Sequence, residues 1–158
     1  MSKALVAYFS ASGITMKVAV RLAAGIWADV FEIKPEKPYT DADLRWTNPI
    51  ARCNREKIGR KDVPIADTLS NFAIYDILYL GFPIWYYAAP NIIQTFVKQY
   101  DLGNTRIALF ATSGGSDIGK TADKLKPFLS PGAKIIGAKV LQPNVSDGEL
   151  RAWAAGIK

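Results

Sequence analysis

The sequence predicts an α/β protein in which five parallel strands form one doubly wound sheet with helices on both of its faces. Short apolar runs alternate along the chain with longer segments of helical periodicity, and this alternation is typical of βαβ units. The apolar runs are nearly continuous, as expected for strands that are buried on both faces. The length of 158 residues favours one core, so we expect a single domain over residues 1–158.

The first strand, the first helix and the second strand are predicted from the opening third of the chain. Residues 5–9 (LVAYF) are apolar throughout, and a helix is expected over 14–25. Three apolar side chains share one face of this helix at i, i+4 and i+8: Val18, Leu22 and Ile26. Gly25 is placed to end the helix. A second short strand is expected at 30–33, and Pro35 stops it.

The regular alternation lapses between about residues 35 and 66. This stretch contains several prolines and the densest group of basic residues, and it has no sustained period. Connections of this length inside a small domain are usually functional or poorly ordered. Large apolar side chains argue against a solvated linker: Tyr39, Leu44, Trp46 and Ile50. We therefore expect an ordered insertion, followed by a short helix at about 67–72.

The alternation resumes in the second half of the chain. Three further strands are expected, at 77–82, 107–111 and 135–141. Helices are expected between them at about 90–100, with Pro90 in the first turn, and at about 117–129. Ser146 followed by Glu149 has the spacing of a capping box and predicts the start of a last helix.

The composition excludes several kinds of chemistry. The chain has no histidine, so it can form neither a Ser-His-Asp or Cys-His relay nor a His-ligated zinc site. Its single cysteine, Cys53, excludes an internal disulfide, a CxxC redox pair and a cysteine-ligated zinc or iron–sulfur site. We expect no metal and no catalytic side chain, and a bound cofactor would carry out any demanding chemistry.

The net charge of +6 raises the question of a nucleic-acid partner. The basic residues are scattered, and the densest group is Arg52, Arg55, Lys57, Arg60 and Lys61. We interpret this group as part of a solvated loop, with a nucleic-acid-binding patch as the alternative. The N-terminal apolar run is too short for a signal peptide, and no run approaches the roughly 20 residues of a membrane helix. We expect a cytoplasmic protein that binds neither nucleic acid nor membrane.

Ligands of open α/β sheets bind beyond the carboxyl ends of the strands, where the strand order reverses. After the first predicted strand, residues 10–15 (SASGIT) place three hydroxyls and a glycine at the start of a helix. Backbone N–H groups and the helix dipole at such a position suit a phosphate, and hydroxyls add donors. The loop has no Lys or Arg, which favours a phosphate monoester over a triphosphate. The alternative is that a hydroxyl such as that of Ser12 only caps the helix.

The loop after the third predicted strand contains three consecutive aromatic residues, Trp85, Tyr86 and Tyr87. Pro83 and Pro90 flank them. Adjacent side chains of an extended loop diverge, so at least one should face the cleft, where a planar ligand could stack on it. The alternative is that all three fill the core beneath the insertion.

The loop after the fourth predicted strand is rich in glycine and hydroxyls. Residues 114–121 match the phosphate-loop pattern G-x-x-x-x-G-K-[ST] and lie between a strand and a helix. A nucleoside triphosphatase that used Gly119, Lys120 and Thr121 would also need a strand that ends in Asp to hold magnesium. No predicted strand does so. The glycines are better explained by close approach of the backbone to a ligand.

These three loops, in this order on an alternating chain, resemble the flavodoxin-like family. Residues 5–15 (LVAYFSASGIT) resemble its phosphate loop, S/T-x-T/S-G-x-T. Residues 81–90 (GFPIWYYAAP) and 112–116 (TSGGS) resemble a bacterial branch, which also has an insertion similar to 34–44 (KPEKPYTDADL). The resemblance covers nearly the whole chain. It implies the strand order 2-1-3-4-5, with FMN bound where that order reverses.

The resemblance assigns a part of FMN to each loop. The phosphate would be held by the first loop, through Ser10, Ser12, Gly13, Ile14 and Thr15. The edge and one face of the isoalloxazine ring would meet Pro83, Ile84, Trp85, Tyr86 and Tyr87. The pyrimidine side of the ring would meet Thr112, Ser113, Gly114 and Gly115.

Two departures from the family bear on the type of electron transfer. Flavodoxins that carry electrons are typically acidic, whereas this chain has a sequence pI of about 9.4. Carrier flavodoxins also commonly have a glycine near flavin N5, whose peptide flip stabilises the one-electron-reduced flavin, and Ala88 and Ala89 stand here instead. Both favour an NAD(P)H- or quinone-linked reductase, with a one-electron carrier as the alternative. The partner would be a redox protein or a small-molecule electron donor or acceptor. The oligomeric state is left open.

Overall fold

The computed structural model describes residues 3–10, 13–37, 40, 65–66, 74–84, 89–100, 102–103, 105–112 and 121–157. Its strands are β1 (Ala4–Tyr8), β2 (Asp29–Glu32), β3 (Ile77–Pro83), β4 (Arg106–Thr112) and β5 (Lys134–Val140). Its helices are α1 (Ile14–Ile26), α3 (Asn91–Gln99), α4 (Thr121–Leu125) and α5 (Asp147–Gly156), and a 3₁₀ turn, Lys126–Phe128, follows α4.

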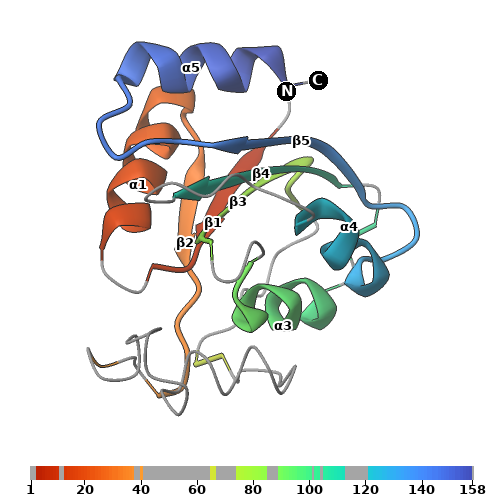
Figure 1. The fold of residues 1–158 in the computed structure, drawn as a ribbon. Coiled ribbons are helices and arrows are strands. Elements are labelled where there is room, and N and C mark those ends of the chain that lie inside the picture. Colours follow the sequence, from red (N-terminus) through yellow and green to blue (C-terminus); the bar gives the residue numbers. More distant parts are fainter. Residues whose placement is uncertain are drawn as a thin grey trace.

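The five strands form one sheet of order β2-β1-β3-β4-β5, and every neighbouring pair is parallel. The predicted fold class and strand order are confirmed. In Figure 1, α1 and α5 cover one face of the sheet, and α3 and α4 cover the other. The strand order reverses between β1 and β3, so the carboxyl ends of these two strands mark the switch point of the fold.

The sheet separates two hydrophobic cores, and β3 contributes to both of them. Leu78, Leu80 and Phe82 lie in the core beneath α3 and α4, whereas Ile77 and Tyr79 lie in the core beneath α1 and α5. Side chains of a strand point alternately to the two faces, so a strand covered on both sides must be apolar at every position. This geometry explains the continuous apolar runs in the sequence.

Helix α1 runs one residue past the predicted end at Gly25. Trp27 takes the left-handed conformation that ends the helix, with φ of 59°, and its side chain is 96% exposed. Gly25 has a different role, because a Cβ there would lie 3.1 Å from Cγ of Arg151 on α5. The missing side chain lets α1 and α5 approach each other, so the predicted role of Gly25 as a helix terminator is wrong.

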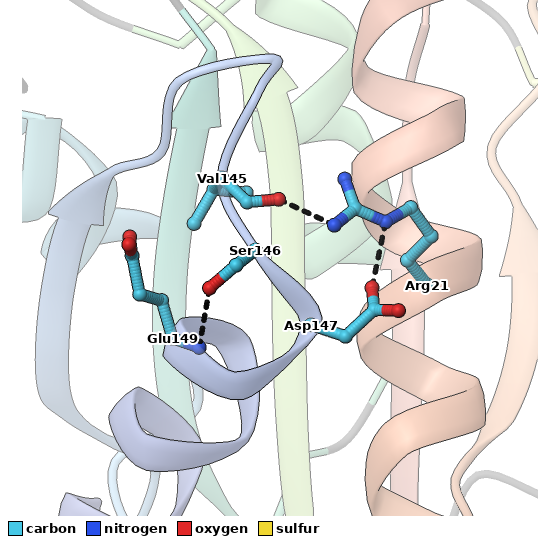
Figure 2. A network of polar contacts seen from close by, with 5 residues as sticks. All are labelled: Arg21, Val145, Ser146, Asp147 and Glu149. Atoms are coloured by element: carbon cyan, nitrogen blue, oxygen red, sulfur yellow. Dashed lines mark hydrogen bonds and ion pairs between the residues drawn. The ribbon is translucent and has the colours of Figure 1, made fainter.

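Helix α5 begins as its capping box predicts. Ser146 Oγ accepts a hydrogen bond from the backbone N–H of Glu149 at 3.1 Å. Figure 2 shows that Arg21 of α1 reaches the same turn. Its Nε donates to Asp147 Oδ1 at 2.8 Å, and its guanidinium also donates to the carbonyl oxygen of Val145. One side chain therefore ties α1 to the start of α5.

The helix predicted over 117–129 is shorter on its carboxyl side. α4 ends at Leu125, and residues 126–128 form a single 3₁₀ turn that contains Pro127. Proline has no N–H to donate within a helix and its ring clashes with the preceding turn, which accounts for the early end. Residues 117–120 lie outside the described residues. Pro90, predicted in the first turn of α3, is the N-cap residue directly before Asn91.

The insertion leaves and rejoins the fold at one place. Pro35 and Ile65 form an isolated antiparallel bridge, and Ala66 N–H donates to the carbonyl oxygen of Lys34 at 2.7 Å. Ile65 is buried in the core beneath α3. Within the predicted boundaries of 35–66, residues 38–39 and 41–64 lie outside the described residues, as does the helix expected at 67–72.

A polar network joins three chain segments at the amino ends of the strands. The Tyr75 hydroxyl donates to Asp29 Oδ2 at 2.8 Å, and Lys3 Nζ lies 3.7 Å from the same oxygen. The backbone N–H of Lys3 donates to Asp76 Oδ2 at 3.1 Å. Burial and the hydrogen bond to Asp29 raise the pKa of Tyr75 to about 12.

Among the described residues, no helix combines the length and apolar character that crossing a membrane requires.

Candidate functional site

The carboxyl ends of β1, β3 and β4 are joined to one another by backbone hydrogen bonds. Phe9 N–H, just after β1, donates to the carbonyl oxygen of Gly81 on β3 at 3.0 Å. Ile84 N–H, just after β3, donates to the carbonyl oxygen of Thr112, the last residue of β4, at 3.1 Å. The three loops predicted to bind a ligand therefore start from one continuous edge.

The first loop enters α1 through a glycine in a left-handed conformation. Gly13 is the N-cap residue, with φ of 91°, a conformation that residues with a Cβ rarely adopt. Ser10 Oγ accepts a hydrogen bond from Gly13 N–H at 3.0 Å. A hydroxyl that accepts in this way keeps its own proton, so Ser10 can still donate to a ligand.

The first turn of α1 presents N–H groups that the helix itself leaves without a partner. The first hydrogen bond of the helical pattern runs from Lys17 N–H to the carbonyl oxygen of Gly13, at 3.2 Å. The N–H groups of Ile14, Thr15 and Met16 therefore have no partner within the helix. Gly13 has no side chain to cap them, and the first turn contains no acidic residue. This arrangement of neutral donors at a helix dipole fits a phosphate group.

Thr15 and Thr112 link the first loop to the third. Their Oγ1 atoms lie 2.7 Å apart, and either hydroxyl can be the donor. The side chains are deeply buried, with Thr15 1% and Thr112 5% exposed. Since β3 lies between β1 and β4 in the sheet, this bond spans the end of β3 and connects loops that are 97 residues apart in the sequence.

The second loop is described only at its two ends. Pro83 is the last residue of β3, beside Thr112, and Ile84 packs partly buried against the core beneath α3. On the other side of the loop, Ala89 is buried in the same core. The remaining predicted ligand residues lie outside the described residues: Ser12, Trp85, Tyr86, Tyr87, Ser113, Gly114 and Gly115. Their roles stay predictions.

Tyr8 is a titratable residue at the carboxyl end of β1, where the first loop begins. It is buried among the residues beneath α1. Burial, and to a lesser degree the charge of Glu32, raise the pKa of its phenol. Tyr8 therefore stays neutral at physiological pH and adds no negative charge against an anion.

The strand ends argue against the triphosphatase alternative. The five strands end at Tyr8, Glu32, Pro83, Thr112 and Val140, and none ends in the Asp that such enzymes use to hold magnesium. Within the described ranges, no group of three acidic or cysteine side chains gathers where it could bind a metal ion. Thr121 of the 114–121 pattern is fully buried at the start of α4.

Sequence patterns did not predict the hydrogen bond between Thr15 and Thr112. Each threonine was assigned separately to a ligand, through its own loop. A pattern within one loop carries no information on a partner 97 residues away. The available signal is the strand order itself, because it brings the ends of β1 and β4 to the two sides of β3.

Comparison with known families identifies one match that spans nearly the whole chain. The profile of the family described as Flavodoxin matches residues 3–157. A search of curated proteins gave no match.

Solved structures with similar sequences have the same fold. A candidate flavoprotein from Bacteroides eggerthii DSM 20697 is 38% identical, with a TM-score of 0.89, covering 99% of this chain and 98% of that chain. A candidate flavoprotein from Bacteroides uniformis ATCC 8492 is 34% identical, with a TM-score of 0.87, covering 98% of each chain. A flavoprotein from Lactobacillus acidophilus NCFM, solved in complex with FMN, is 26% identical, with a TM-score of 0.75, covering 98% of this chain and 99% of that chain.

Proposed function

The chain belongs to the flavodoxin family, and from this premise we propose that it is a redox flavoprotein that binds FMN without a covalent bond. The observation that carries the proposal is the open first turn of α1, which presents neutral donors at the switch point of the sheet. The relative from Lactobacillus acidophilus that was solved with FMN supports the choice of this flavin.

The residues of the chain bind and orient the cofactor in this proposal. FMN, when bound, supplies the electron transfer. The N–H groups of the first turn of α1 and the Ser10 hydroxyl hold the phosphate, and Gly13 gives the backbone the left-handed conformation that exposes them. The aromatic residues at 85–87 remain the predicted contacts of the isoalloxazine ring. No side chain needs to act as a nucleophile.

Flavin titration of the apoprotein tests the proposal. We expect FMN to bind at micromolar or lower concentrations, with quenched flavin fluorescence and the absorbance bands of oxidised flavin. Replacement of Ser12 and Thr15 together by Ala should weaken FMN more than riboflavin, because only FMN carries a phosphate. Equal losses for both flavins would contradict the phosphate site. A chain that binds no FMN at these concentrations would contradict the function.

The finer proposal is a two-electron reductase linked to NAD(P)H or a quinone. Ala88 and Ala89 in the second loop, where carrier flavodoxins commonly have a glycine, support it, as does the net charge of +6. A cytoplasmic location and a redox protein or small-molecule partner belong to this proposal. The one-electron carrier is the alternative.

Stepwise anaerobic reduction followed by absorbance separates the two possibilities. A reductase should pass from oxidised to fully reduced flavin without a distinct intermediate spectrum, and NAD(P)H should drive quinone reduction. The variants Ala88→Gly and Ala89→Gly restore a glycine to this loop. They should increase the population of the one-electron-reduced flavin if the loop composition sets the preference. A well-populated intermediate in the wild-type chain would favour the carrier.

A further inference from the structure

Thr112 joins all three loops of the candidate site. Its carbonyl oxygen accepts from Ile84 N–H at the start of the second loop, and its hydroxyl pairs with Thr15 in the first turn of α1. As the last residue of β4, it also precedes the third loop. Between side chains of α1 and β4, this is the hydrogen bond that the described part of the chain contains. Displacement of Thr112 would therefore disturb more than its own loop.

The burial of the pair limits what its hydroxyls can do. Both side chains are almost fully enclosed, and each hydroxyl has the other as its partner. A buried hydroxyl that loses its partner carries the full cost of desolvation. The pair therefore holds the first turn of α1 at a fixed position against the end of β4. The N–H groups of that turn are the ones that face a phosphate in the proposed function.

We propose that Thr112 is a positioning residue for the phosphate site and acts through Thr15. This inference rests on the proposed binding of FMN. The family resemblance gives Thr112 a different role, contact with the pyrimidine side of the ring. A residue that positions the phosphate site affects the affinity for FMN more than that for riboflavin, whereas a residue that contacts the ring affects both affinities alike. Hydrogen bonds to an anion weaken steeply as distance and angle change, so a shifted first turn should cost phosphate affinity selectively.

Binding of FMN and of riboflavin to the same apoprotein variants tests this role. Thr112→Val keeps the shape of the side chain but removes the hydroxyl, and Thr112→Ser keeps the hydroxyl. We expect Thr112→Val to weaken FMN about tenfold and riboflavin less than twofold, since one buried hydrogen bond contributes up to about tenfold in an equilibrium constant. Thr112→Ser should bind both flavins within twofold of the wild-type chain.

Thr105 provides the matched control. It is a buried threonine that directly precedes the other end of β4, and its hydroxyl donates to the carbonyl oxygen of Leu102. Thr105→Val should lower stability without changing the affinity for either flavin. If Thr112→Val yields no folded protein, Thr112→Ala takes its place with the same expected ratio of the two affinities.

A double-mutant cycle shows whether Thr112 acts through Thr15. In a Thr15→Val background, Thr112→Val should weaken FMN by less than a further twofold. An undiminished loss in that background would overturn the inference, as would equal losses of FMN and riboflavin or no loss at all. A wild-type chain that binds neither flavin would instead overturn the proposed function, and this is seen before any variant is made.

Discussion

The amino ends of the strands form one edge of the sheet, the amino edge, and their carboxyl ends form the opposite one, the carboxyl edge. Different kinds of interaction hold these two edges together. At the amino edge, Asp29 accepts a hydrogen bond from the Tyr75 hydroxyl and lies near the ammonium group of Lys3. The backbone N–H of Lys3 donates to Asp76, and the Thr105 hydroxyl donates to the backbone three residues away. At the carboxyl edge, Thr112 bonds the neutral hydroxyl of Thr15 across the end of β3. Neutral donors suit the first turn of α1, where the anion is proposed to bind, because a carboxylate at that turn would repel the ligand.

The largest loss of stability is expected from Gly81→Ala on β3, next to the carboxyl edge. A Cβ at Gly81 would lie 2.2 Å from Cζ of Phe110, whose ring packs edge-on against Trp153. We expect the free energy of unfolding to fall by about 3 kcal/mol, as for severe overpacking of a core. Urea unfolding measures it. Gly156→Ala, where a Cβ meets no atom within 4 Å, is the control and should be close to neutral.

Two left-handed glycines allow the edges to be compared directly. Gly13 at the carboxyl edge and Gly103 at the amino edge have φ of 91° and 54°, and a Cβ would meet nothing within 4 Å at either position. Each substitution by Ala should cost about 1 to 2 kcal/mol of stability through backbone strain alone. Only Gly13→Ala should also weaken FMN, as measured by flavin titration. An equal loss of affinity in Gly103→Ala would remove the distinction between the edges.

The smallest effect on stability is expected from the loss of the Tyr75 hydroxyl at the amino edge, and this effect depends on pH. The pKa of Tyr75 is raised from 10 to about 12 in the folded chain, so its stabilising contribution is complete below pH 10 and is lost as the pH rises towards 12. Tyr75→Phe should cost about 1 kcal/mol at pH 8, and the gap to the wild-type chain should shrink by pH 11.5. Urea unfolding at both pH values provides the measurement. A gap that stays constant would show that the pKa of Tyr75 is not raised in the folded chain.

The strands were predicted well because each one is marked by a pattern among neighbouring residues. Continuous apolar runs located all five strands, and the capping-box spacing located the start of α5 at Ser146. Features that depend on distant residues were less predictable. Gly25 looks like a helix terminator until α5 is seen to pack on it through Arg151. The partnership of Thr15 with Thr112 likewise emerges only from the strand order.

The bridge between Pro35 and Ile65 brings the two ends of the insertion together. Both ends of the excursion are fastened at one point, by the bridge and by the hydrogen bond from Ala66 to Lys34. The entropy of closing such a loop grows only with the logarithm of its length. Residues added or removed between these two contacts should therefore change the free energy of unfolding little, and the strands on either side should keep their register.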